Sequence, residues 1–174
     1  MRMNTAEQAK LLEEAFRECD IEKLSQSIDL GADLNMTDEC GIPLWDAIKF
    51  IFDFREDSIG KDEIGLGDSI AEENHLYEFL DLSIDYGLNL NAVVQEKGSS
   101  EYVCPLFWLI YYCYSPEFLS YLISKGADIN LVIGRQTLLD RIGEENWFDS
   151  EIMESRNEWM EWVAEYLRAR SPKL

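Results

Sequence analysis

The chain of 174 residues is long enough for one folded domain or a short array of repeats, and its 47% hydrophobic and 12% aromatic content excludes an intrinsically disordered chain. Its formal net charge of −20 disfavours nucleic acid and anionic membranes as partners and favours a basic protein or a cation. Acidity that serves solubility alone is an equally open interpretation.

The hydrophobic periodicity of the first half predicts helices at 5–17, 21–30 and from 43 through 54, then a glycine-containing surface insertion at 55–69, then a helix at 70–86. Asp20 can cap the second helix through its side chain. Gly31 can end that helix, since glycine accepts the left-handed conformation found there.

The second half begins with a polar loop at 92–103 that has a hairpin-like tip. Further helices are predicted from Pro105, at 116–125, at 137–142 and at 147–168. The aromatic content of 105–114 leaves a strand there as an alternative, although the proline at its start favours a helix.

The first residues are charged and lack the apolar core of a secretory signal, and the longest apolar run, 105–114, is too short to cross a bilayer. The cysteines show no paired CxxC spacing, so we expect small buried hydrophobic residues in a reducing compartment: Cys19, Cys40, Cys104 and Cys113. These features predict a cytoplasmic protein.

A five-residue segment recurs three times. Gly-Ala-Asp-Leu-Asn at 31–35 and Gly-Ala-Asp-Ile-Asn at 126–130 are nearly identical, and 87–91, Gly-Leu-Asn-Leu-Asn, is a degraded copy. Each copy follows an apolar helical pattern. A unit used three times indicates a stacked repeat array rather than a fold with a single core.

The motifs around these segments resemble the ankyrin-repeat family, whose repeats open with Thr-Pro-Leu-His-x-Ala and close with Leu-Leu-x-x-Gly-Ala-Asp-x-Asn. The opening motif is matched at 42–47 by Ile-Pro-Leu-Trp-Asp-Ala, and more weakly at 104–109 and 137–142. The closing motif is matched well at 122–130. The family's histidine is missing from all three openings.

The spacing agrees with this resemblance, because Pro105 and Leu138 are 33 positions apart, the ankyrin period. The resemblance implies an all-α fold: a short ankyrin-like helical repeat solenoid of about four helix pairs with hairpin-like finger loops. We expect a single domain over 1–174, with the insertion at 55–69 and a capping helix at about 147–168.

No catalytic, cofactor or metal site is predicted. His75 is the only histidine, and its place on a predicted helix indicates a solvent-facing side chain. The glycines at 65 and 67 lack the strand and third glycine of a phosphate loop, and the acidic pairs lack the ligand spacing of a calcium loop.

The resemblance implies that a partner binds the finger tips and the concave face of the first helices. Carried onto this chain, those positions are Asp38, Glu39, Asp46, Lys49, Phe50, Trp108, Tyr111, Tyr112, Arg141, Glu144 and Glu145. Aromatic side chains ringed by charge are typical of binding hot spots. Packing beneath a long finger is the alternative for Trp108 and Tyr111. Trp159 and Trp162 could also bind a partner, although packing on the preceding repeat is favoured.

The leading hypothesis is a non-catalytic module, monomeric when free, that binds a basic protein. Small, acidic, divergent ankyrin-like proteins look similar to bacterial immunity proteins, which neutralise toxins that are often nucleases. The alternative is a scaffold or adaptor that binds a peptide or protein in the concave groove.

Overall fold

The computed structural model describes residues 5–51, 75–113, 116–128, 130–138 and 140–141, with short pieces at 161–162, 165–166 and 168–169. These residues are mainly helical, as predicted, and they include two short antiparallel strand pairs in addition. The predicted insertion at 55–69 and most of the predicted helix at 147–168 lie outside the described residues.

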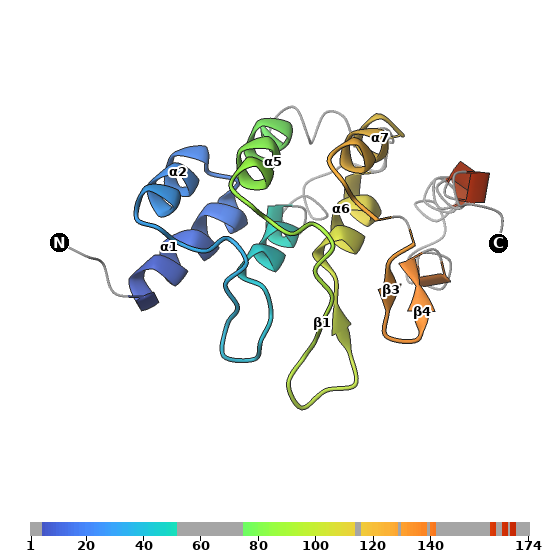
Figure 1. The fold of residues 1–174 in the computed structure, drawn as a ribbon, viewed down its shortest axis with the longest axis horizontal. Helices are drawn as coiled ribbons and strands as arrows, with labels where there is room; N and C mark the ends of the chain where they lie inside the picture. The colour runs from blue at the N-terminus through green and yellow to red at the C-terminus, as the bar shows by residue number, and fades with distance from the viewer. Residues whose placement is uncertain are drawn as a thin grey trace, which may run out of the picture.

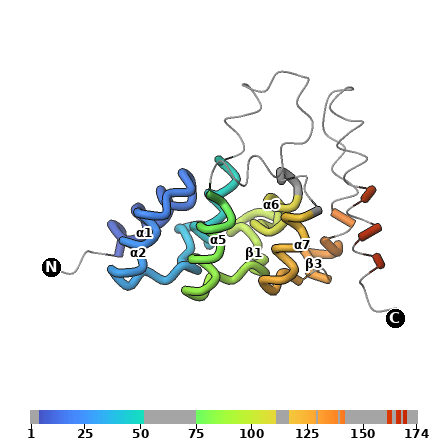
Figure 2. Tube along the Cα trace, turned by 90° about the horizontal axis from the view of Figure 1, so that it is seen from above, coloured from blue at the N-terminus to red at the C-terminus, as the bar shows by residue number. Residues whose placement is uncertain are grey.

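Figure 1 shows helix pairs side by side, each followed by a loop that descends to a hairpin or hairpin-like turn. In chain order the helices are α1 (Thr5–Glu18), α2 (Ile21–Asp29), the 3-10 helix η1 (Leu44–Lys49), α5 (Leu76–Asp85), α6 (Pro105–Cys113) and α7 (Pro116–Ser124). Seen from above, α1, η1 and α6 form one layer and α2, α5 and α7 a second (Figure 2).

Two short strand pairs form the hairpins. Strand β1 (Val94–Gln95) pairs with β2 (Tyr102–Val103), and β3 (Val132–Ile133) pairs with β4 (Gln136–Thr137). The turn at 36–44 is their counterpart after α2, closed by a single bridge between Thr37 and Pro43.

The helices that follow Pro43 and Pro105 differ in type. At 105–113 the structure has the helix α6, so the alternative of a strand there is wrong. The segment after Pro43 begins as the 3-10 helix η1, where the Asp46 amide donates to the Pro43 carbonyl at 3.0 Å, rather than as the predicted α-helix. Hydrogen bonds between residues three apart define the 3-10 helix, which occurs mostly in short pieces.

One continuous hydrophobic core runs through all the helix pairs. Each of five helices contributes one large, fully buried ring: Phe16, Trp45, Phe79, Phe107 and Phe118. Phe16 of α1 meets Phe79 of α5 edge to face, with ring centroids 5.5 Å apart. Because Phe16 and Phe79 come from different helix pairs, this contact shows that neighbouring pairs bury one another's apolar faces.

The ends of the second helices share one geometry, which confirms the role predicted for Gly31. Gly31, Gly87 and Gly126 have φ of +78°, +92° and +96°. The amide after each glycine donates to the carbonyl five residues before it, at 2.9 to 3.0 Å. Each glycine amide also donates to the carbonyl three residues before it. A helix end closed by these two hydrogen bonds needs a residue in the left-handed conformation, which only glycine adopts without strain. Asp20 caps α2 as predicted, accepting from the Lys23 amide at 3.0 Å.

The cysteine prediction is confirmed in part. Cys19 and Cys104 are buried, whereas Cys40 is exposed at the tip of the turn after α2, so the prediction of burial is wrong for Cys40. Burial raises the pKa of the Cys19 thiol to about 12, and burial also raises the pKa of Cys104. Both buried thiols are therefore neutral and behave as small apolar groups.

Candidate functional site

The three recurring segments, which we call the asparagine loops (31–35, 87–91 and 126–130), are joined by side-chain amides. Asn35 donates its Nδ2 to the Gly87 carbonyl at 2.8 Å, and its Oδ1 accepts from the Asn89 amide at 2.8 Å. One carboxamide thus satisfies both an acceptor and a donor of the next loop, 52 and 54 residues away.

Asn91 repeats this arrangement one step along the chain. Its Nδ2 donates to the Gly126 carbonyl at 3.0 Å, and its Oδ1 accepts from the Asp128 amide at 2.8 Å. The two carboxamides hold the asparagine loops in register, so that equivalent positions of the three loops form rows across the molecule. Sequence analysis identified these segments as turns and missed the bridges between them.

The hairpins below the asparagine loops also contact one another. The Lys97 amide, near the tip of the second hairpin, donates to the Cys40 carbonyl of the first turn at 3.2 Å. Arg141 donates to the Tyr102 carbonyl at 3.0 Å, and its guanidinium lies over the Phe107 ring at 5.0 Å. The hairpins therefore form a continuous surface rather than independent fingers.

A substitution at Gly134 would test the packing between the second and third hairpins. It has φ of +68°, and a Cβ added there would lie 2.9 Å from two atoms of the Tyr102 ring. We expect Gly134→Ala to lower the free energy of unfolding by about 1–3 kcal/mol, from backbone strain plus the displaced ring. Urea unfolding followed by circular dichroism measures this loss.

Gly98→Ala is the matched control, since Gly98 has φ of +85° and nothing within 4 Å of the added Cβ. It should lose only the strain component, and Tyr102→Ala should remove the excess loss of Gly134→Ala. Equal losses at Gly98 and Gly134 would show that the ring contact does not exist.

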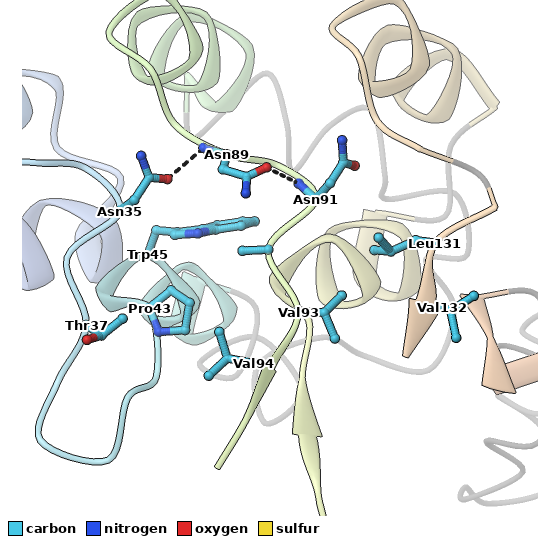
Figure 3. Close-up of a pocket in the computed structure, with 11 residues that line it drawn as sticks. Asn35, Thr37, Pro43, Trp45, Asn89, Asn91, Val93, Val94, Leu131 and Val132 are labelled. Atoms are coloured by element: carbon cyan, nitrogen blue, oxygen red, sulfur yellow. Dashed lines mark hydrogen bonds between the residues drawn. The ribbon is translucent and has the colours of Figure 1, made fainter. Parts of the chain in front are cut away.

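A groove of about 500 Å³ lies between the asparagine loops and the hairpins. Figure 3 shows the asparagines along its upper edge, Trp45 at its centre, and η1 and α6 behind it. Its lining consists of Asn35, Thr37, Pro43, Trp45, Asn89, Asn91, Ala92, Val93, Val94, Leu131 and Val132.

None of the described residues that line the groove is titratable. Its walls are mainly apolar, and Val132 is 56% exposed. Trp45 is fully buried, and its indole Nε1 is a donor without a hydrogen-bond partner. Apolar walls with a few amide groups suit a peptide segment that brings both apolar side chains and backbone carbonyls.

Among the predicted partner-binding residues whose side chains the structure describes, none lines this groove. Asp38 and Glu39 are exposed in the turn after α2, where Asp38 Oδ1 accepts from the amides of Cys40 and Ile42 at 2.8 and 2.9 Å. Asp46 is only 4% exposed and forms a 2.7 Å ion pair with Lys49. The Asp46 carboxylate therefore faces the protein rather than a partner.

Phe50 directly follows η1, and Trp108, Tyr111 and Tyr112 lie on α6. Phe50 is half-buried under the Arg17 guanidinium, 4.5 Å from its ring centroid. Trp108 is half-buried on α6, with its ring 5.1 Å from that of Phe107. The backbone of Tyr111 and Tyr112 belongs to α6, but their side chains lie outside the described residues, as do Glu144 and Glu145. The binding role of this set stays a prediction.

Two further predictions concern His75 and the C-terminal aromatics. His75 is exposed at the start of α5, as expected. Trp162 packs against the core and stacks on Tyr166 at 4.9 Å, and the Tyr166 hydroxyl lies 2.9 Å from the Ser120 hydroxyl. Packing on the preceding helices, the favoured interpretation of Trp162, is confirmed. Trp159 lies outside the described residues.

Within the described part of the chain, no group of three or more histidine, cysteine or acidic side chains could hold a metal ion. The helices of that part are all too short or too polar to span a bilayer.

No family model matches the chain, and no curated protein matches it. Among solved structures, the chain is similar to one chain of the complex of the Bd0816 predatory endopeptidase from Bdellovibrio bacteriovorus with the immunity protein Bd3460. The identity is 20%, over 93% of this chain and 98% of that chain, with a TM-score of 0.26. A score of this size does not establish a shared fold.

Proposed function

We propose that this protein is a non-catalytic, ankyrin-like binding module that inhibits a basic protein partner, in the manner of an immunity protein that neutralises a toxin nuclease. The observation that carries the proposal is the formal net charge of −20 on a chain of 174 residues. Such a charge attracts a cationic surface over a long range and speeds its association.

The arrangement of the described residues supports a binding role. The asparagine loops and hairpins present a continuous surface, and the groove within that surface is lined, as far as the described residues go, by uncharged side chains. The paired helices, with a glycine ending α2, α5 and α7, support the proposal of a repeat-like module. Stacked arrays of this kind commonly serve as extended binding surfaces.

Affinity capture tests the proposal. The full chain, immobilised at low salt, should retain from a lysate of its own cells a protein with an isoelectric point above about 9, and salt should release it. If the partner is a nuclease, its activity should fall in proportion to the complex formed. Recovery of neutral or acidic proteins alone, or retention that salt does not affect, would contradict the proposal.

A second candidate function, an adaptor that binds a peptide, is favoured by the groove itself. Its apolar walls and the side-chain amides along its edge suit an extended, uncharged segment. Binding of that kind depends on apolar burial and should be nearly independent of salt, which separates it from the first candidate.

A further inference from the structure

Two exposed apolar side chains occupy equivalent positions in neighbouring helix pairs. In the described part of the chain the exposed large hydrophobic residues are Leu30, Tyr86 and Val132, at 37%, 59% and 56%. Leu30 directly precedes Gly31, and Tyr86 directly precedes Gly87. The two are therefore the last residues before the same type of helix end, rather than scattered surface positions.

The bridge made by Asn35 joins the loops that follow these two positions. Its 2.8 Å bond to the Gly87 carbonyl fixes the loop after α2 against the residue that follows Tyr86. Helices α2 and α5 are also in contact, and Figure 1 shows their following loops descending side by side. Leu30 and Tyr86 consequently form one row on the layer of second helices.

Aspartates flank this row on both helices. Asp29 precedes Leu30, Asp85 precedes Tyr86, and Asp33 follows in the first asparagine loop, and all three are exposed. Among the described residues no basic side chain forms an ion pair with any of them. Their charges therefore remain available to a partner.

At the third helix pair, a basic residue takes the place of the exposed apolar side chain. The residue before Gly126 is Lys125, whose Nζ forms a 2.7 Å ion pair with Asp81 of α5. Burial of Asp81 acts to raise its pKa, but the hydrogen bonds from Lys125 and Tyr121 outweigh burial and hold the pKa below its usual value. The charge of Asp81 is thus paired within the chain, and the position before the third glycine carries a lysine in place of an exposed apolar side chain.

We propose that Asp29, Leu30, Asp33, Asp85 and Tyr86, the acidic–apolar patch, bind a basic segment of the partner that places an apolar side chain on Leu30 and Tyr86 and its cationic side chains against the aspartates. This inference rests on the proposed function and locates its contact surface. Charge complementarity selects a cationic occupant, and an exposed tyrosine and an exposed leucine at equivalent helix ends provide apolar contacts of the kind found in hot spots. The patch lies on the second-helix layer, away from the first-helix positions predicted from the sequence.

The test uses the full chain, the variants Leu30→Ser, Tyr86→Ser and the double variant Asp29→Asn/Asp85→Asn, and a short synthetic peptide that alternates lysine with leucine. NMR titration should shift the amides of 29–33 and 85–88 most. Either serine variant should weaken binding at least about tenfold. The asparagine variant should weaken binding at low salt and reduce its salt dependence.

Val132→Ser is the matched control, because Val132 is as exposed as Tyr86 but lies on β3. It should bind like the parent chain. A lysine-only peptide should bind more weakly than the alternating peptide. Equal binding of both peptides, parent-like binding by Leu30→Ser and Tyr86→Ser, or shifts centred on the hairpins or on α1 and α6 would each overturn the proposal.

The same variants separate this inference from the function on which it rests. If a captured basic partner binds Leu30→Ser and Tyr86→Ser as tightly as the parent chain, the patch is wrong and the proposed function stands. If capture yields no basic partner, the proposed function fails, and the peptide titration alone decides whether the patch recognises a basic apolar segment.

Discussion

Replacing Phe79 with alanine is expected to lower the free energy of unfolding by about 3–5 kcal/mol. Phe79 is fully buried on α5 and meets Phe16 of α1 edge to face at 5.5 Å. The loss combines the transfer of the ring to water with the cavity left between two helix pairs. Urea unfolding monitored by circular dichroism measures it, with the slope of free energy against urea unchanged if the chain unfolds as one unit.

A double-mutant cycle with Phe16→Ala shows whether the two helix pairs stabilise each other. We expect a coupling free energy of about 0.5–1.5 kcal/mol, the range found for edge-to-face rings. Tyr86→Ala is the control, since Tyr86 lies at the end of the same helix but is exposed, and its effect should stay within about 0.5 kcal/mol. A coupling of zero, or separate unfolding transitions, would contradict mutual stacking of the pairs.

Asn91→Ala is expected to lower the free energy of unfolding by about 1–3 kcal/mol, because it removes two hydrogen bonds that join the second and third asparagine loops. Asn35→Ala should have a similar but smaller effect, since Asn35 is more exposed than Asn91. Thermal and urea unfolding of each variant measure these losses.

Asn89→Ala is the matched control for both asparagine bridges. The Asn89 side chain accepts from the Asn91 amide, a bond within its own loop, and it forms no bridge to another loop in the described structure. Its replacement should cost less than half of the loss at Asn91. Equal losses at Asn89 and Asn91 would show that the bridges contribute nothing beyond ordinary turn bonds.

Local features of the fold could be predicted from the sequence. Gly31 as the end of a helix and Asp20 as a cap depend on residues within one or two turns, and both are confirmed. The helix at 105–113 followed from its opening proline. Nothing in the 43–49 segment distinguished a 3-10 helix from an α-helix, and the structure has a 3-10 helix there.

Features that depend on contacts between distant segments were missed. The asparagine at the fifth place of all three loops was visible, but its bridge to a loop more than 30 residues away is a tertiary contact. Asp46 was placed on a binding face by its position in a motif, whereas the structure pairs it with Lys49 in a buried position. The exposure of Leu30 and Tyr86 could not be predicted either, because both belong to apolar helical patterns.

If charge attracts this protein to a basic partner, the association rate constant for the captured partner should depend on ionic strength. Between about 0.01 M and about 0.15 M, where the Debye length falls from about 30 Å to about 8 Å, we expect the rate constant to fall at least about tenfold while the dissociation rate constant changes little. An association rate constant that stays the same over this range would contradict the claim.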